Sequence, residues 1–160
     1  MAGVQFKYGK KGGISELEKR LKTSVGNAGV KVGILEKSGA HKESPGLTVA
    51  DVASFHEFGT ENVVQRSFIR ATVINKAPLF KKAVQGLLKG IILGSMNRER
   101  ALGILGELAQ AEMINTINAG ISPPLAESTR RAKMVGGKAG DTPLVDSGQL
   151  KQSIRWEINR

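Results

Sequence analysis

Cysteine is absent from the sequence, which excludes disulfide bonds, thiolate metal sites and a cysteine nucleophile. Histidine occurs twice, at His41 and His56, and neither has a second ligand at metal spacing except Glu57, which lies on another face of the expected helix. The motifs G-x-G-x-x-G and G-x-S-x-G are missing as well. The sequence therefore predicts a protein that is not an enzyme and that has no metal ion, no cofactor and no small-molecule substrate.

Long apolar runs and aromatic residues are also scarce. The chain has no apolar run of about eighteen residues, and its N-terminus lacks the apolar core of a signal peptide. We therefore expect a soluble protein that is made in the cytoplasm and has no membrane partner. Aromatic residues make up 4% of the chain, while glycine accounts for 20 of its 160 residues. This composition predicts a thin aliphatic core with many turns or close backbone contacts.

Acidic residues are outnumbered by basic ones, 14 against 24, which gives a net charge of +10. Residues 1–37 hold eight basic and three acidic groups, so this part alone supplies +5. Such an excess attracts nucleic acid or an acidic protein surface through long-range electrostatic fields. Residues 1–14, with Lys7, Lys10 and Lys11, are expected to form a flexible basic arm, for which a frayed terminus is the plainer interpretation.

The first half of the chain contains patterns of both helix and strand. Residues 16–24 are expected to form a short amphipathic helix, because Leu17, Leu21 and Val25 share a face. Alternating apolar residues from Val30 to Ile34 predict the first strand.

A polar stretch at residues 36–47 is expected to be a surface loop. Thr48 has the position of a helix N-cap and Gly59 that of a C-terminal cap, so a short helix is expected between them, with His56 packed on it. Residues 63–74 are rich in β-branched side chains and are expected to form the second strand.

Two long helices are expected at residues 78–94 and 98–119. In the second, apolar residues recur at intervals of three and four and should lie across the sheet: Ala101, Ile104, Leu105, Leu108, Ala111, Ile114 and Ile117. Gly86, Gly90 and Gly94 recur every four residues in the first helix, which suits either tight helix packing or a subunit contact.

The last quarter of the chain begins at Pro123 and Pro124, which cannot continue a helix. A polar surface stretch follows at residues 128–133, and the glycine-rich residues 134–142 are expected to form a mobile loop. Asp141 and Asp146 flank Pro143, but nothing nearby would desolvate either carboxylate, so we interpret both as turn caps. Ile154, Trp156 and Ile158 then alternate with polar residues in a half-buried strand.

These elements together predict one α+β domain over residues 1–160. A small antiparallel sheet would pack against a long helix or helix pair, with extended loops and the basic arm at the N-terminus.

Two pieces of the sequence form one longer pattern. The first piece comprises His56, Glu57, Phe58, Gly59 and Thr60, followed by Arg66, Phe68, Ile69 and Arg70. The second piece comprises Pro124, Leu125, Thr129, Lys133, Pro143, Leu144, Asp146, Ser147, Gly148, Leu150, Ser153 and Ile154. In this order the two pieces resemble the neck or tail-completion (virion morphogenesis) proteins of long-tailed bacteriophages. The chain departs from that family pattern at Val64 and Ser67, where such proteins commonly have prolines.

The resemblance implies a structural protein of the virion, assembled in the host cytoplasm and located where head and tail join. It implies a closed homo-oligomeric ring, expected to be a hexamer, that touches head-closure or adaptor proteins and tail-terminator or tail-tube proteins, with DNA passing nearby. The alternative is a basic nucleic-acid-binding protein, which the net charge favours. The scarcity of aromatic residues for base stacking argues against that alternative.

Overall fold

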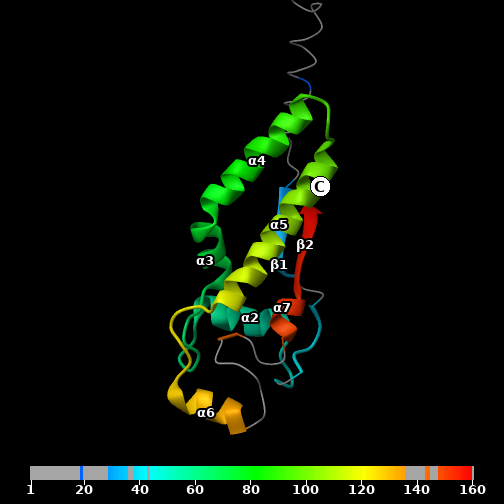
Figure 1. Cartoon of the computed structure of the whole chain (residues 1–160). Coiled ribbons are helices and arrows are strands. Elements are labelled where there is room, and N and C mark those ends of the chain that lie inside the picture. Colours follow the sequence, from blue (N-terminus) through cyan, green and yellow to red (C-terminus); the bar gives the residue numbers. More distant parts are fainter. Residues whose placement is uncertain are drawn as a thin grey trace, which may run out of the picture.

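The computed structural model describes residues 19, 29–35, 38–42, 44–135, 143–144 and 148–159. Within these residues the fold is α+β, as the sequence predicts, with one small antiparallel sheet and six helices (Figure 1). The helices are α2 (Val49–Phe58), α3 (Phe68–Asn75), α4 (Ala77–Ile92), α5 (Arg98–Ala119), α6 (Glu127–Val135) and α7 (Gln149–Gln152). The arm at residues 1–14 and nearly all of the helix expected at 16–24 lie outside the described residues, although Lys19 is helical and exposed.

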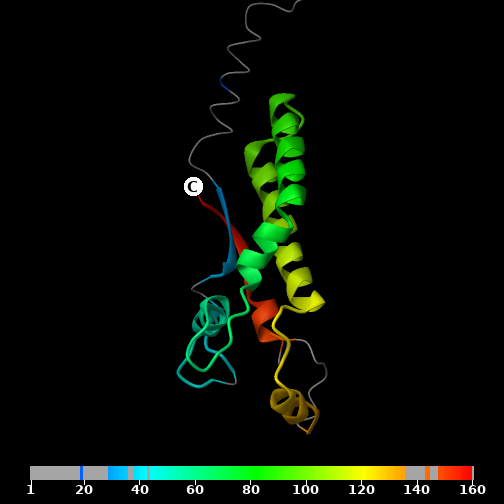
Figure 2. The ribbon, with the colours of Figure 1, turned by 90° about the vertical axis from the view of Figure 1, so that its left-hand side faces the viewer.

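The sheet joins two strands from opposite ends of the chain, β1 (Gly29–Ile34) and β2 (Ile154–Asn159). They pair antiparallel, with Val32 opposite Trp156. Because side chains alternate along a strand, the apolar residues of both strands share one face. Both strands contact α5 (Figures 1 and 2), and the other face carries an exposed ion pair between Lys31 and Glu157 at 4.0 Å. The two predicted end strands are therefore confirmed.

The central position of Trp156 among the alternating apolar residues of β2 predicts that it is buried, and this prediction is wrong, because Trp156 is only half-buried. Its ring lies flat against α5 where that helix has glycines. A Cβ on Gly106 would come within 2.6 Å of Trp156 Cδ2, and one on Gly103 would lie 3.5 Å from Trp156 Cη2. Because these two glycines have no side chain, α5 leaves a space that the indole occupies.

The second predicted strand, at residues 63–74, is wrong, because Phe68–Asn75 forms α3. Phe68 and Thr72 are buried while Arg70 is exposed, so the period is that of a helix and not the alternation of a strand. Thr72 Oγ1 donates to the Phe68 carbonyl at 2.7 Å. Hydrogen bonds from the first turn of this helix to Glu57 stabilise it. They offset the lower helix propensity of its β-branched residues.

Helix α2 begins and ends where the sequence predicts. Thr48 and Asp51 form a reciprocal capping box, with Asp51 N donating to Thr48 Oγ1 at 3.1 Å and Thr48 N donating to Asp51 Oδ2 at 2.8 Å. Hydrogen bonds from the Thr48 hydroxyl and backbone hold the pKa of Asp51 below its usual value. Gly59 follows the helix with a φ of 77°, which suits glycine.

Helices α4 and α5 form a hairpin at the positions predicted from the sequence (Figure 1). Asn97 caps α5 by accepting from Arg100 N at 2.8 Å. The buried residues of α5 are Ala101, Gly106, Met113 and Ile117. The expected α5 face is therefore partly wrong, since Ile104 is 38% exposed and Ala111 is exposed.

None of the residues of α4 is buried. A Cβ on Gly86 would meet no atom within 4 Å, and one on Gly90 would make only ordinary contacts with Ser95 and Met96. Tight packing among the described residues therefore does not explain the glycines at positions 86 and 90. The subunit contact remains a prediction.

The core lies where α2, α3, α7 and β2 meet the C-terminal half of α5. It consists of Val49, Ala53, Phe68, Met113, Ile117, Leu150 and Ile154. The polar stretch after the two prolines lies on the surface as expected, but it is helical, forming α6 with no buried residue. Most of the loop predicted at 134–142 lies outside the described residues.

Candidate functional site

Arg66 joins the two pieces of sequence that carry the family resemblance. Its Nε donates to the Pro123 carbonyl at 2.8 Å, and its Nη2 donates to the Pro124 carbonyl at 3.1 Å. Its backbone N–H donates to the His56 carbonyl at 2.7 Å. Only 9% of the residue is exposed, so these carbonyls satisfy a guanidinium that is largely removed from water. Through its backbone and its side chain, this one residue fixes the end of α2 and the path of the chain after α5 relative to each other.

Glu57 is buried as well and fixes the next helix. Its Oε2 accepts from Ile69 N at 2.9 Å and its Oε1 accepts from Arg70 N at 3.1 Å. These amides lie in the first turn of α3, where Ser67 makes no side-chain cap, and a carboxylate there also interacts favourably with the helix dipole. Glu57 therefore supplies the N-terminal cap of α3 from the preceding helix.

The turn between α2 and α3 is held to the backbone of Glu57. Ser67 Oγ donates to the Glu57 carbonyl at 2.7 Å, and Gln65 Nε2 donates to the same oxygen at 3.0 Å. Thr60 Oγ1 accepts from the amides of Asn62 and Val63 at 3.3 and 3.0 Å. We call this set of contacts, from Glu57 to Arg66 and on to Pro124, the motif junction.

His56 lies beside the motif junction and is partly buried, as expected for a packed residue. Its Nδ1 is buried and has no hydrogen-bond partner among the described residues. Burial lowers the pKa of His56, and the positive charges of Arg66 and His41 lower it further. The imidazole is therefore neutral at pH 7, and protonation would place a second cation next to the guanidinium.

The apolar residues of the motif form part of the core. Phe68 and Ile154 are fully buried and Leu150 is 7% exposed. Pro143 is buried, and Leu144 packs against the core. Gly148 has a φ of 74° and precedes α7, while Ser153 ends that helix by donating its N–H to the Gln149 carbonyl at 2.9 Å.

The remaining motif residues lie at or near the surface. Phe58, Arg70, Pro124 and Thr129 are exposed, while Leu125 and Lys133 are half-buried. Asp146 and Ser147, and the expected turn caps Asp141 and Asp146, lie outside the described residues. The structure thus places most of the predicted site residues in or beside the core, and a few of those that it describes are exposed.

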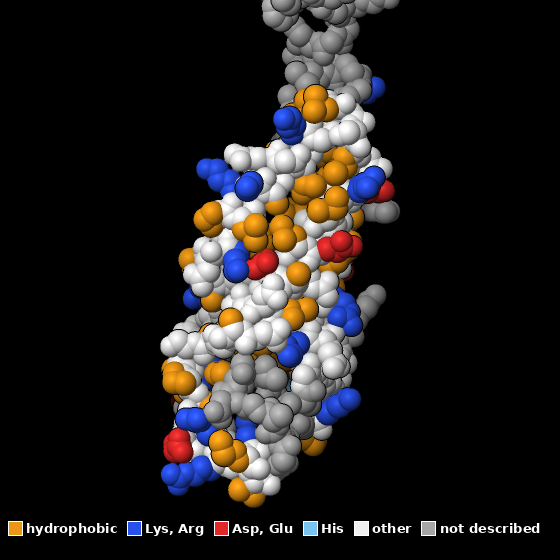
Figure 3. Space-filling view, in the orientation of Figure 1, with side chains coloured by type: hydrophobic (Ala, Val, Ile, Leu, Met, Phe, Trp, Pro, Cys, Tyr) orange, Lys and Arg blue, Asp and Glu red, His pale blue; other side chains and the backbone are white. Residues whose placement is uncertain are grey.

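Exposed apolar side chains are a surface feature that the sequence patterns did not predict. On α3 they include Val73 and Ile74, which are 55% and 64% exposed, and beyond α4 Leu93 is 68% exposed. Hydrophobic side chains also gather along the α4–α5 hairpin in the view of Figure 3. With the period of a helix over residues 68–75, Val73 and Ile74 lie on a different side from Phe68. Apolar groups concentrated in this way favour a protein contact.

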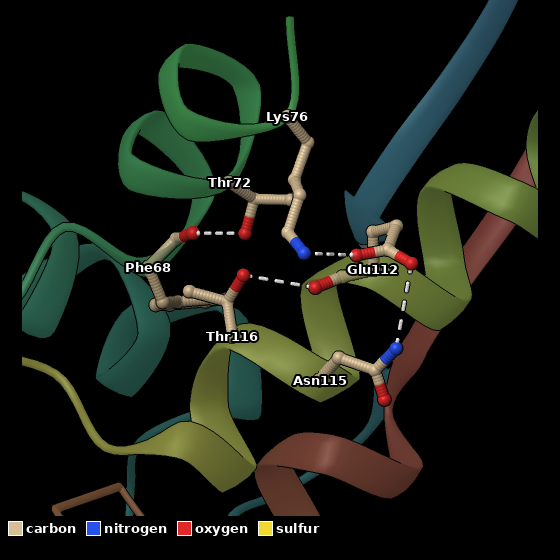
Figure 4. A network of polar contacts seen from close by, with 6 residues as sticks. All are labelled: Phe68, Thr72, Lys76, Glu112, Asn115 and Thr116. Carbon is tan, nitrogen blue, oxygen red and sulfur yellow. Dashed lines mark hydrogen bonds and ion pairs between the residues drawn. The ribbon is translucent and has the colours of Figure 1, made fainter. Parts of the chain in front are cut away.

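The connection between α3 and α4 is attached to α5 by a polar network (Figure 4). Lys76 Nζ lies 2.9 Å from Glu112 Oε2. The same carboxylate accepts from Asn115 Nδ2 at 3.5 Å, and Thr116 Oγ1 donates to the Glu112 carbonyl at 2.9 Å. The glutamate side chain is only 15% exposed, so this ion pair is screened less than one on the open surface.

Within the described part of the chain, no cluster of His, Asp and Glu side chains could hold a metal ion. None of the helices described is both long enough and apolar enough to span a bilayer. Comparison of the chain with protein-family models, with curated proteins and with solved structures gives no match.

Proposed function

We propose that the chain is a structural protein of the head–tail junction of a long-tailed bacteriophage. In this proposal it forms a ring, expected to be a hexamer, between head-closure or adaptor proteins and tail-terminator or tail-tube proteins, and it catalyses no reaction. The observation that carries the proposal is the motif junction. Arg66 bonds the two resemblance-bearing pieces to each other through Pro123 and Pro124, as expected if they belong to one shared fold.

The exposed apolar residues support an assembling subunit. Val73 and Ile74 lie next to the Lys76–Glu112 network, which fixes their helix to α5. Apolar groups on a fixed helix make a preformed contact surface, so association costs little ordering entropy. Contacts between unlike faces of neighbouring subunits generate a ring when their rotation closes.

The net charge of +10 suits a ring through which DNA passes. Scattered cations contact phosphates without reading base edges, so affinity for duplex DNA should be weak, about 10⁻⁴ to 10⁻⁶ M, and should fall steeply with salt. A nucleic-acid-binding protein is the alternative. A preference of about a hundredfold, or about 2.7 kcal/mol, for one of two unrelated duplexes would favour that alternative.

Electron microscopy of the purified protein, combined with light scattering over a concentration series, tests the ring. We expect rings of one subunit number, and we expect Ile74→Asp to shift the assembly towards monomers. The matched control is Asn75→Asp, which adds the same charge at the neighbouring exposed position and should assemble normally. A wild-type protein that stays monomeric at about 100 µM would contradict the proposal.

A further inference from the structure

An apolar groove of about 340 Å³ runs between the sheet and the hairpin. Leu105 of α5 forms part of its floor. Val30 and Val32 of β1 line one wall, and Phe80 and Val84 of α4 line the other. A groove with an apolar floor and two apolar walls has the shape that accepts one amphipathic helix.

The groove continues along the hairpin into a second apolar hollow of about 150 Å³. The two share Val84 and Leu105, and the second extends to Ile91 of α4 and to Arg98 of α5. From Val84 to Ile91 the helix rises about 10 Å. This hairpin groove, as we call the two hollows together, is bordered by a helix with no buried residue.

The segment just before β1 has the sequence of a helix that would fit this groove. Ile14, Leu17, Leu21 and Val25 follow at intervals of three and four, so they share one face of a helix. A helix over residues 14–25 is about 18 Å long, which matches the part of the groove that α4 lines from Phe80 to Ile91, about 16 Å. The other positions are polar or charged and suit solvent.

The position of the start of β1 places this segment within reach. Gly29 starts β1 level with the middle of the hairpin (Figure 2), and the next residue, Val30, lines the groove. Residues 26–28 are the only link, and three residues span at most about 10 Å. The segment therefore begins within reach of the wall of the groove.

Charge fits the same orientation. With Val25 near the start of β1, the N-terminal half of the segment reaches the second hollow, which Arg98 lines. Glu16 and Glu18 lie in that half. Opposite charges meeting at one end of a groove fix the direction in which a helix lies.

We propose that residues 14–25 dock as an amphipathic helix in the hairpin groove of their own chain. The docked segment covers the apolar side of α4 and completes a layer of helices on the sheet. The proposal concerns the single chain and holds whether or not the protein forms a ring.

Disulfide trapping tests the docking directly, because the chain has no cysteine of its own. Leu21→Cys combined with Val84→Cys should form an intrachain disulfide under mild oxidation, seen as a faster monomer band on a non-reducing gel. The control is Thr23→Cys with Val84→Cys, since Thr23 lies on the polar face of the same helix. We expect the control to link at least about ten-fold more slowly.

Two results of the trapping would overturn the proposal. Equal linking in both pairs would show that the segment only collides with the groove. Linked dimers in place of linked monomers would show that a neighbouring copy supplies the segment.

Amide exchange of the otherwise native chain gives a second measurement that introduces no thiol. Leu17→Asp with Leu21→Asp should raise exchange in α4 at least about ten-fold, because the docked helix no longer shields that helix, while Thr23→Asp should leave it unchanged. Unchanged exchange in the double variant would overturn the docking.

Discussion

The two ends of α5 lie in different environments. At its C-terminal end, α2, α3, α7 and β2 surround it with fully buried side chains, among them Val49, Phe68 and Ile154. At its N-terminal end it pairs with α4, a helix of 16 residues that buries none of them. We call the first region the junction end and the second the hairpin end.

The junction end is held by contacts among the described residues, whereas the hairpin end has apolar surface that those residues leave uncovered. At the junction end Glu57 and Arg66 are hydrogen-bonded and the side chains of Phe68 and Ile154 are fully buried, so contacts among the described residues hold that region together. At the hairpin end apolar residues line open hollows. Helix propensity and a few contacts with α5 hold α4 there. Substitutions should therefore cost much at the junction end and little at the hairpin end.

The largest effect is expected from Phe68→Ala. Phe68 is fully buried, so the truncation leaves a cavity and should lower the free energy of unfolding by about 3 to 5 kcal/mol. Phe58→Ala is the matched control, because this phenylalanine is 67% exposed and should change stability by no more than about 0.5 kcal/mol. Urea denaturation of both variants measures the difference. Similar losses would mean that the junction end is not the better-packed region.

Arg66→Ala should have the next largest effect. The change removes two hydrogen bonds that a largely buried guanidinium donates to the carbonyls of Pro123 and Pro124, at a cost of about 2 to 3 kcal/mol. Arg70→Ala removes the same side chain from an exposed position in the next helix and should cost no more than about 0.5 kcal/mol. If both variants unfold at the same urea concentration, the motif junction contributes nothing to stability.

Two glycine substitutions should change stability in opposite directions. Gly106→Ala places a Cβ 2.6 Å from the Trp156 ring, and displacing the indole should cost about 1 to 3 kcal/mol. Gly86→Ala meets no atom within 4 Å and should stabilise the hairpin end by about 0.5 to 1 kcal/mol through helix propensity. Thermal melts followed by circular dichroism check both. A destabilising Gly86→Ala would show that another segment packs against that glycine.

Local signals predicted much of the fold. The Thr48 cap and the alternation of Ile154, Trp156 and Ile158 each depend on neighbours close in sequence, and the structure has both. The strand predicted at residues 63–74 is wrong because a contact from outside that segment decides its structure. Glu57 caps α3 from a different helix, and no propensity scale contains a contact across a turn of that length.

The candidate site was predictable as a set of residues but not as a geometry. The resemblance selected Arg66 and Pro124 without indicating that the two would be bonded. A pairing between a side chain and a carbonyl 58 positions later leaves no periodic trace in the sequence. The exposure of Val73 and Ile74 could not be predicted either, because it follows from the helix that was read as a strand.

The smallest expected effect is a pH dependence of the free energy of unfolding from His56, which lies at the junction end. Burial, and then the charges of Arg66 and His41, lower the pKa of His56 in the folded protein. The unfolded chain therefore binds more protons near and below the ordinary histidine pKa of about 6.5. The histidine's contribution to stability is complete above that pH and is lost as the pH falls.

Urea titrations at several pH values between about 8 and 5 measure this loss, and this range lies above the titration of most carboxylates. The unfolding midpoint of the wild type should decrease over the range, and His56→Gln should reduce that decrease. His41→Gln is the control, since it removes a second histidine but leaves the buried imidazole beside Arg66. The midpoint of His56→Gln could decrease as much as that of the wild type. In that case His56 does not bind protons more tightly in the unfolded chain than in the folded one, and the motif junction tolerates a protonated imidazole.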